Sequence, residues 1–374
     1  MAVNDPKKTQ WEITVSELGL DDLSVRLAEW LAPKLGADAP PRITRIDRPD
    51  AGMSGTTVLF DVEWTASGST EAGSYVLRMP PGVLPLMQTY DLGRQFEVMR
   101  ALAAADVVPV PEMCWYEATA DNPLGSPFFI MRHVDGRIPS DNPPYVFMGW
   151  ILDASQEQRA QLMRGTVDVL AKVHSIPDVT ETFPMLAGDG DALRRHVDES
   201  QAWYQWALVD AGHAIPLIEK GFAWLEANWP TEPSPDVLIW GDARPANIIY
   251  DGFDPAAAID WEMAALGPRE VDVAWIIYMQ RFFQFLASLH GAPGIPDFLR
   301  RDDVVDRYQE CSGEQLQELD FYLVYSAVRH AIAMARAFVR MVHFGEFAVP
   351  EDPDDFIMQR PLLTALLEGT HTWE

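Results

Sequence analysis

The sequence has few cysteines and no long apolar run. Only Cys114 and Cys311 occur among its 374 residues, which excludes a disulfide framework or a cluster of thiolate ligands for zinc or iron–sulfur. No stretch reaches the ~18 uncharged apolar residues that a membrane span requires. No apolar segment follows Lys7 and Lys8, as a secretory signal would need. We therefore expect a cytoplasmic protein without a membrane partner.

Basic residues are also scarce. The 28 Lys and Arg residues stand against 56 Asp and Glu residues, which gives a formal net charge of −28 at pH 7. Such a field repels extended polyanions, so we expect no nucleic-acid partner. It would favour cationic small molecules, although an excess of carboxylates is also typical of highly soluble proteins. With 48% hydrophobic residues, the chain can fill two or three domain-sized cores.

Short β-branched and aromatic runs separated by turn residues predict a sheet in the first third of the chain. A run of good helix formers over 94–105 predicts one helix within it. The apolar spacing over 11–35 predicts a helix in an N-terminal extension, residues 1–40. The predicted strands cover residues 42–46, 56–64, 74–79, 115–117 and 127–132.

From about residue 134 the pattern becomes helical. Ser155 followed by Gln158 forms a capping box, which predicts a helix that ends at His174. His174 lies on the apolar face of that helix, so we interpret it as a core histidine. A single strand pair around 237–260 interrupts the later helices. Those helices are predicted over roughly 191–228, 269–287, 299–309 and 313–343.

Three polar residues surround a predicted hairpin. The strands Asn247–Tyr250 and Ala257–Trp261 are joined by a loop that begins Asp-Gly, a strong hairpin signal. Asp242 precedes the first strand and Asp260 lies at the end of the second. Antiparallel pairing therefore brings Asp242, Asn247 and Asp260 to one end of the hairpin.

Two carboxylates and an amide oxygen suit Mg²⁺, a hard cation that keeps several positions for water and substrate phosphates. Asp242 and Asn247 also have the spacing of a kinase catalytic loop, an Asp followed after four residues by an Asn. In that chemistry one carboxylate orients the acceptor hydroxyl and the metal ligands hold the phosphates. The sequence therefore predicts metal-assisted phosphoryl transfer.

The segment Trp240–Asn247 resembles the His-Gly-Asp-x-x-x-x-Asn loop of the aminoglycoside phosphotransferase and choline kinase-like family. Ile259-Asp-Trp-Glu is similar to the metal motif of that family. The resemblance implies that Asp242 is the catalytic base and that Asn247 and Asp260 are Mg²⁺ ligands that bind ATP. It also implies an α+β, bilobal protein-kinase-like fold, with an N-terminal antiparallel sheet lobe (41–133) and a larger helical C-terminal lobe (134–374). ATP is then expected between the lobes.

Positions implied to hold the nucleotide depart from the family pattern. Arg78 stands where a Lys is usual, and Gln95 stands where its Glu partner is expected. The segment Gly52–Thr57 resembles the phosphate-covering loop, with Ser54 and Gly55 as its contacts. The hinge residues Arg132 and Val134 are implied to pair with adenine through a carbonyl and an amide.

Three further features bear on activity. Trp240 replaces the loop His and is expected to pack under the metal loop; Arg244 is interpreted as a surface ion pair and Asp272 as a loop anchor. Aromatic residues between Trp275 and Phe285 could line an acceptor site, although core packing is the preferred interpretation.

The acceptor is expected to be a small hydroxylated molecule: an aminoglycoside, an amino alcohol or, by resemblance to an acyl-CoA-dehydrogenase-associated branch, a hydroxyacyl compound. A catalytically silent nucleotide-binding scaffold is the alternative, and the oligomeric state stays open.

Overall fold

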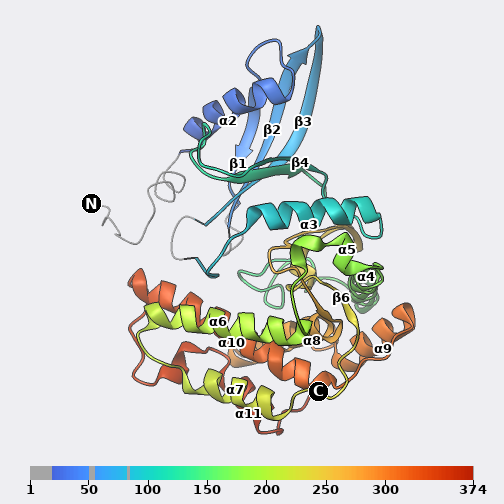
Figure 1. The fold of residues 1–374 in the computed structure, drawn as a ribbon, viewed down its shortest axis with the longest axis vertical. Coiled ribbons are helices and arrows are strands. Elements are labelled where there is room, and N and C mark those ends of the chain that lie inside the picture. Colours follow the sequence, from blue (N-terminus) through green and yellow to red (C-terminus); the bar gives the residue numbers. More distant parts are fainter. Residues whose placement is uncertain (1–18, 50–54, 82–84, 374) are drawn as a thin grey trace. The chain divides into compact units, whose positions relative to one another are not determined.

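The computed structural model describes residues 19–49, 55–81 and 85–373. The chain divides into two compact units, and the ribbon in Figure 1 follows the chain through both. Unit 1 comprises Met1–Arg100 and Pro111–Val134, and unit 2 comprises Ala101–Val110 and Asp135–Glu374. Unit 1 contains an antiparallel sheet and unit 2 is mainly helical, so the predicted α+β fold class is confirmed.

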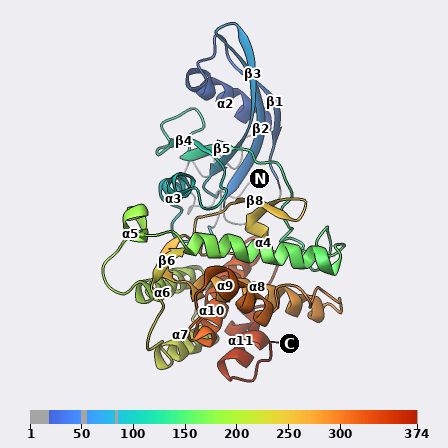
Figure 2. The same cartoon turned by 90° about the vertical axis from the view of Figure 1, so that its right-hand side faces the viewer.

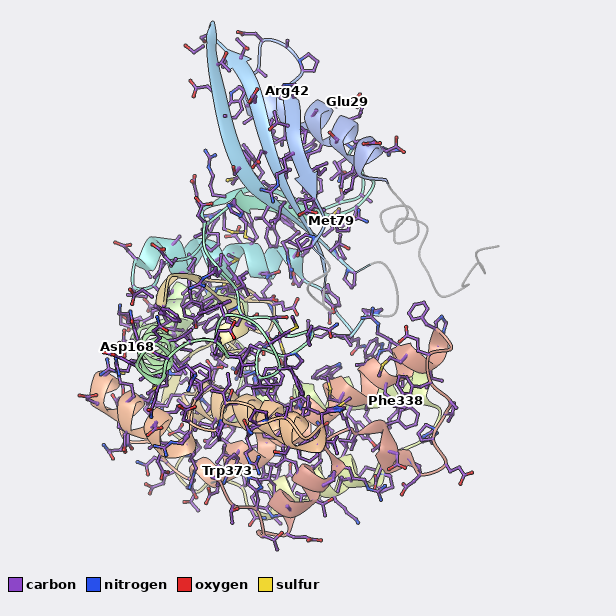
Figure 3. All side chains as sticks on the ribbon, turned by 180° about the vertical axis from the view of Figure 1, so that it is seen from behind. Glu29, Arg42, Met79, Asp168, Phe338 and Trp373 are labelled. Atoms are coloured by element: carbon purple, nitrogen blue, oxygen red, sulfur yellow. The ribbon has the colours of Figure 1, made fainter. Side chains whose placement is uncertain are left out.

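Unit 1 is built on one five-stranded antiparallel sheet (Figure 1). Its strands are β1 (Arg42–Asp47), β2 (Thr56–Ala66), β3 (Ser69–Met79), β4 (Met113–Glu117) and β5 (Phe128–Arg132). They lie in the order β1-β2-β3-β5-β4. Figure 3 labels Arg42 at the start of β1 and Met79 at the end of β3. The β-branched and aromatic runs of the sequence thus form the predicted strands, because such residues pack well on a pleated surface.

Helix α2 (Leu20–Lys34) packs on this sheet through a buried apolar stripe. The ring of Trp30 meets Phe128 edge-on at a centroid distance of 4.9 Å and Trp115 at 6.0 Å. Helical spacing places one face toward the core. The predicted helix is confirmed from Leu20 onward, and residues 11–18 lie outside the described residues. The other buried residues of the stripe are Leu23, Leu27 and Leu31.

Helix α3 (Leu92–Ala105) confirms the helix predicted at 94–105. Phe96 stacks on Tyr116 of β4, with ring centroids 5.5 Å apart. A Cβ at Gly93 would lie 2.8 Å from the Tyr116 hydroxyl, so the helix and the strand approach closely there. This packing fixes the first turns of α3 on the sheet.

Unit 2 contains long helices, among them α8 (Glu270–Leu289) and α10 (Leu319–His343), which are labelled in Figure 2. Most residues of these two helices are buried. The predicted capping box is present, since the Ser155 hydroxyl accepts from Gln158 N and the Gln158 side chain accepts from Ser155 N. Figure 3 labels Phe338 on α10, whose ring lies 5.3 Å from that of Phe356. The helices are α4 (Gln156–His174), α5 (Val179–Thr182), α6 (Ala192–Ala211), α7 (Pro216–Ala227), α8 (Glu270–Leu289), α9 (Arg301–Ser312), α10 (Leu319–His343) and α11 (Arg360–Leu367).

Two predicted helical segments have different limits in the structure. The segment 191–228 is two helices, because Gly212 closes α6 with φ of 79° and Pro216 opens α7. The segment 313–343 becomes helical only at Leu319, since Gly313 ends α9 in the left-handed region with φ of 75°. Local turn chemistry decided both boundaries.

The prediction of a single strand pair around 237–260 is wrong. β7 (Ile248–Asp251) and β8 (Asp254–Ala258) form the predicted hairpin. β6 (Asp236–Ile239) pairs instead with β9 (Ala265–Pro268), which the sequence reading did not include. The β6–β9 pairing encloses the hairpin, so the chain before the hairpin and the chain after it are held side by side.

The segment that opens unit 2 is tied to this hairpin. Arg137 N donates to the Tyr250 carbonyl oxygen at 2.8 Å, and Tyr250 N donates to the Arg137 carbonyl oxygen at 2.9 Å. Gly136 has φ of 152°, and a Cβ there would lie 2.5 Å from the Ile249 side chain and 2.7 Å from the Tyr250 carbonyl oxygen. Only glycine fits this close approach.

Among the residues that the structure describes, no helix has the length and apolar character needed to cross a membrane.

Candidate active site

One buried carboxylate, that of Asp272, holds the loop before Asp242. Trp240 N and Gly241 N donate to its Oδ2 and Oδ1 at 2.7 and 2.8 Å, and His174 Nε2 lies 3.1 Å from Oδ2. Gly241 has φ of 87°, and a Cβ there would lie 2.2 Å from a backbone carbonyl oxygen, which explains the glycine. The interpretations of Asp272 as a loop anchor and His174 as a core residue are confirmed, since both side chains are buried.

The carboxylate of Asp242 is held by three donors. Arg244 Nε and Trp275 Nε1 donate to Oδ1 at 2.8 and 2.7 Å. Asn247 Nδ2 donates to Oδ2 at 2.8 Å. A carboxylate oxygen accepts about two hydrogen bonds. Oδ1 is therefore fully used, whereas Oδ2 keeps the capacity to accept one more donor.

These contacts keep Asp242 ionised. Burial raises the pKa of Asp242, but the charge of Arg244 and the hydrogen bonds from Arg244, Trp275 and Asn247 outweigh it, so the pKa lies below its ordinary value. An ionised carboxylate accepts hydrogen bonds only. The group is therefore suited to orient a hydroxyl that donates to it.

Arg244 forms an ion pair, as the sequence predicts, but the pair lies only partly at the surface. Its side chain is only 17% exposed, and it bridges two carboxylates, Asp242 through Nε and Asp141 through Nη1. Burial raises the pKa of Asp141, Arg244 opposes this, and the negative charges of Asp242 and Asp260 raise it further. The sequence does not indicate a role for Asp141, because its contact with Arg244 joins residues 103 positions apart.

Asn247 and Asp260 meet at the open end of the hairpin. Asn247 is 5% exposed, and its Nδ2 donates both to the carbonyl oxygen and to Oδ2 of Asp242, so its Oδ1 is turned away. Ile259 N donates to the Asn247 carbonyl oxygen at 2.9 Å, and Asp260 follows directly. Asp260 is half-buried and has φ of 60°, a strained conformation that is enriched at functional sites. The predicted trio is therefore brought together.

The donor set fits a magnesium ion. Asn247 Oδ1 and the Asp260 carboxylate are hard oxygen donors at one end of the hairpin. Two protein ligands can suffice for Mg²⁺, because it retains water and takes substrate phosphate oxygens.

Trp240 packs as expected. Its indole Nε1 donates to the Ile259 carbonyl oxygen at 3.0 Å, and its ring stacks on Trp261 at a centroid distance of 4.9 Å. These contacts lie on both sides of Asp260 in the sequence. Trp240 therefore supports the strand end that carries the Asp260 carboxylate.

Apart from Asn247 and Asp260, the residues predicted to bind the nucleotide belong to unit 1. Ser54 is not among the described residues. Arg78 Nη1 donates to the Thr57 hydroxyl at 2.8 Å, and a Cβ at Gly55 would lie 3.5 Å from Arg78 Nη2. The guanidinium of Arg78 thus lies beside Gly55 and Thr57. Gln95 is buried on α3, at 4% exposure.

The two hinge positions lie at the end of β5. Arg132 pairs with Tyr75 of β3, and its guanidinium lies over the Tyr75 ring at 4.5 Å. His133 N donates to the Ser74 carbonyl oxygen at 3.0 Å, and Val134 follows this last hydrogen bond. Their contacts with adenine remain predictions.

The arrangement of Asp242, Asn247 and Asp260 is typical of a phosphotransferase, and comparison with known proteins agrees. The model of the phosphotransferase enzyme family, APH, matches residues 50–310. The chain belongs to this family, and the resemblance found in the sequence is confirmed.

Individual curated proteins are also similar to this chain. The Arabidopsis thaliana protein named probable acyl-CoA dehydrogenase IBR3 is 28% identical over 314 residues, which cover 79% of this chain and 36% of that protein. The chain spans about a third of the length of the curated relatives it matches.

Solved structures share the fold. A Ralstonia eutropha protein provisionally named an aminoglycoside phosphotransferase has a TM-score of 0.64 at 22% identity, over 92% of this chain and 97% of that one. A thermostable mutant of aminoglycoside phosphotransferase APH(4)-Ia, in complex with AMP-PNP and hygromycin B, has a TM-score of 0.53 at 14% identity, over 92% and 99%. At these identities the likeness establishes the fold, and the predicted kinase-like architecture is confirmed.

Proposed function

We propose that the chain is an ATP- and Mg²⁺-dependent phosphotransferase that moves the γ-phosphate to a hydroxyl of a small molecule. The observation that carries this proposal is the Asp242 carboxylate, which is ionised, fixed through Oδ1 and able to accept at Oδ2. Family membership supports phosphoryl transfer, and the AMP-PNP complex of a structural neighbour supports ATP.

Asp242 acts as the base in this proposal. The acceptor hydroxyl donates to Oδ2, and this contact aims the hydroxyl oxygen at the γ-phosphorus. As the new oxygen–phosphorus bond forms, the bond from the γ-phosphorus to its bridging oxygen breaks and ADP leaves with that electron pair. The hydroxyl proton passes to Asp242. Arg244 and Trp275 keep the carboxylate in place throughout.

Asn247 and Asp260 would hold the magnesium ion. When bound, Mg²⁺ would offset the charge of the phosphate oxygens. The nucleotide itself would be held by main-chain groups of the phosphate-covering loop, by one side chain of β3 and one of α3, and by the hinge. Those residues are Ser54, Gly55, Arg78, Gln95, Arg132 and Val134.

The acceptor is a hydroxylated small molecule. A structural neighbour binds hygromycin B, which supports an aminoglycoside-like acceptor. The relatives named acyl-CoA dehydrogenases support a hydroxyacyl compound. A structural neighbour named an ethanolamine kinase supports an amino alcohol. A cytoplasmic location also remains a prediction.

Two measurements test the proposal. Mg²⁺-dependent ATP binding should raise the melting temperature, because a ligand of the folded state stabilises it. ADP release should then be followed with a panel of aminoglycosides, amino alcohols and hydroxyacyl-CoAs. Asp242→Asn should retain ATP binding and lose turnover. Turnover by Asp242→Asn at the wild-type rate would refute Asp242 as the base.

A silent nucleotide-binding scaffold is the second candidate. It is favoured by Arg78 and Gln95 in place of the usual Lys and Glu and by Trp240 in place of His. In that case ATP should shift the melting temperature while no member of the panel supports ADP release.

A further inference from the structure

Arg329 of α10 is a buried cation without a carboxylate partner. Its side chain is 2% exposed. Nη2 donates to the Gly241 carbonyl oxygen at 3.2 Å, whereas Nη1 has no hydrogen-bond partner. No Asp or Glu in the described ranges forms an ion pair with it. Arg244, by contrast, bridges two carboxylates. An uncompensated buried charge is strongly destabilising, so its presence calls for a partner.

The surroundings of Arg329 do not neutralise it. Its Cζ lies 4.8 Å from the ring centroid of Trp275 and 5.7 Å from that of Tyr325. Cation–π contacts of this kind offset only part of the desolvation of a guanidinium. Burial, and then the charge of Arg329, hold the pKa of His196 well below its ordinary value, so His196 is a neutral neighbour.

This cation lies beside the catalytic loop. Trp275 presents one face to Arg329 and donates through Nε1 to Asp242 Oδ1 at 2.7 Å. Gly241, which accepts from Arg329, directly precedes Asp242. The unpartnered guanidinium nitrogen is therefore separated from the carboxylate of the base by a single indole ring.

The next residue, His330, adds a second donor. Its ring lies edge-on to Trp275 at 6.1 Å, and burial lowers its pKa to about 3, so it is neutral. Its Nδ1 lies 3.0 Å from Gln359 Nε2 and 3.3 Å from the Tyr278 hydroxyl. With the amide in this orientation Nδ1 accepts, and the ring proton lies on Nε2. Beside Trp275, α10 thus presents a cation and a neutral N–H donor.

We propose that Arg329 binds an oxyanion of the acceptor, a carboxylate or a phosphate group, and that the acceptor is a hydroxylated anion. The hydroxyl part of this assignment rests on the proposed function, whereas the anion site does not. A cationic amino sugar or amino alcohol would meet an unpaired guanidinium and be disfavoured. The overall charge of −28 favours cations at long range, but the local charge decides what fits at the site.

Two small probes test the site. Calorimetry at constant ionic strength should show that the wild-type protein binds 3-hydroxybutyrate or inorganic phosphate, and the probe that binds identifies the kind of oxyanion. The neutral 3-hydroxybutyramide should not bind. Arg329→Gln should weaken anion binding about ten- to hundredfold, which corresponds to one hydrogen bond to a charged group. Arg340→Gln, eleven residues later on α10, should bind as the wild type does.

Three results would overturn the proposal: wild-type protein that binds neither anion, amide that binds as tightly as its anion, or Arg329→Gln with wild-type affinity. The comparison of anion with amide uses wild-type protein and stays decisive if Arg329→Gln does not fold. Asp242→Asn separates the two proposals, because it should lose phosphoryl transfer and keep anion binding. Anion binding by a wild-type protein that transfers no phosphate would contradict the proposed function and leave the Arg329 site standing.

Discussion

Replacing Asp272 by alanine should destabilise the protein as a whole. The carboxylate accepts the backbone N–H groups of Trp240 and Gly241 at 2.7 and 2.8 Å, and both groups are buried. Alanine leaves both donors without a partner. A hydrogen bond to a charged group contributes about 1.5–3 kcal/mol, so losing two costs about 3–6 kcal/mol. That is a large share of the ~5–15 kcal/mol by which a domain is stable.

Urea unfolding followed by tryptophan fluorescence measures this loss as a change in the free energy of unfolding. Asp168→Ala is the matched control. Asp168 on α4 makes a bidentate pair with Arg307, with both hydrogen bonds at 2.7 Å, but both side chains are partly exposed, so its loss should cost about 1–2 kcal/mol, less than that of Asp272 (Figure 3). A loss below about 1 kcal/mol for Asp272→Ala, with an unchanged denaturant slope, would refute the anchoring role.

Three further outcomes are expected. Gly136→Ala should lower the free energy of unfolding by at least ~1–3 kcal/mol, because of its φ of 152° and the 2.5 Å approach to Ile249; a neutral effect in urea unfolding would contradict this. Arg244→Gln should slow turnover while the melting-temperature shift with Mg²⁺ and ATP stays unchanged; equal turnover would show that Trp275 and Asn247 suffice to hold the Asp242 carboxylate. Burial lowers the pKa of His330 from 6.5 to about 3. As the pH is lowered past 6.5, the unfolded state therefore takes up a proton that the folded state does not, and the free energy of unfolding decreases. By pH 5 this amounts to roughly 2 kcal/mol, which His330→Phe should remove; an unchanged pH profile of unfolding would contradict it.

The start of α4 and the β7–β8 hairpin were predictable because their causes are local. Ser155 and Gln158 form their capping box within one turn of α4. The Asp-Gly loop places Asn247 opposite Ile259 whatever the rest of the chain does. Spacing along a few residues was therefore sufficient for these features.

Long-range pairing was not predictable in the same way. β6 pairs with β9 across the hairpin, and each is too short to carry a clear signal of its own. Arg244 reaches Asp141 from 103 residues away, so the expected surface pair is instead a partly buried bridge between two carboxylates. The periodicity of apolar residues describes one segment at a time, so it does not predict contacts between distant segments.

The sequence by itself determined the family and the α+β fold class, and it predicted that Asp242, Asn247 and Asp260 lie together, because their order and spacing are carried by one hairpin and its flanks. Only the tertiary structure decided how the Asp242 carboxylate is held. Trp275 is 33 residues from Asp242 along the chain, and its indole reaches the carboxylate because α8 packs beside the loop. The same packing leaves Arg329 buried without a carboxylate, since burial and charge compensation depend on which helices meet.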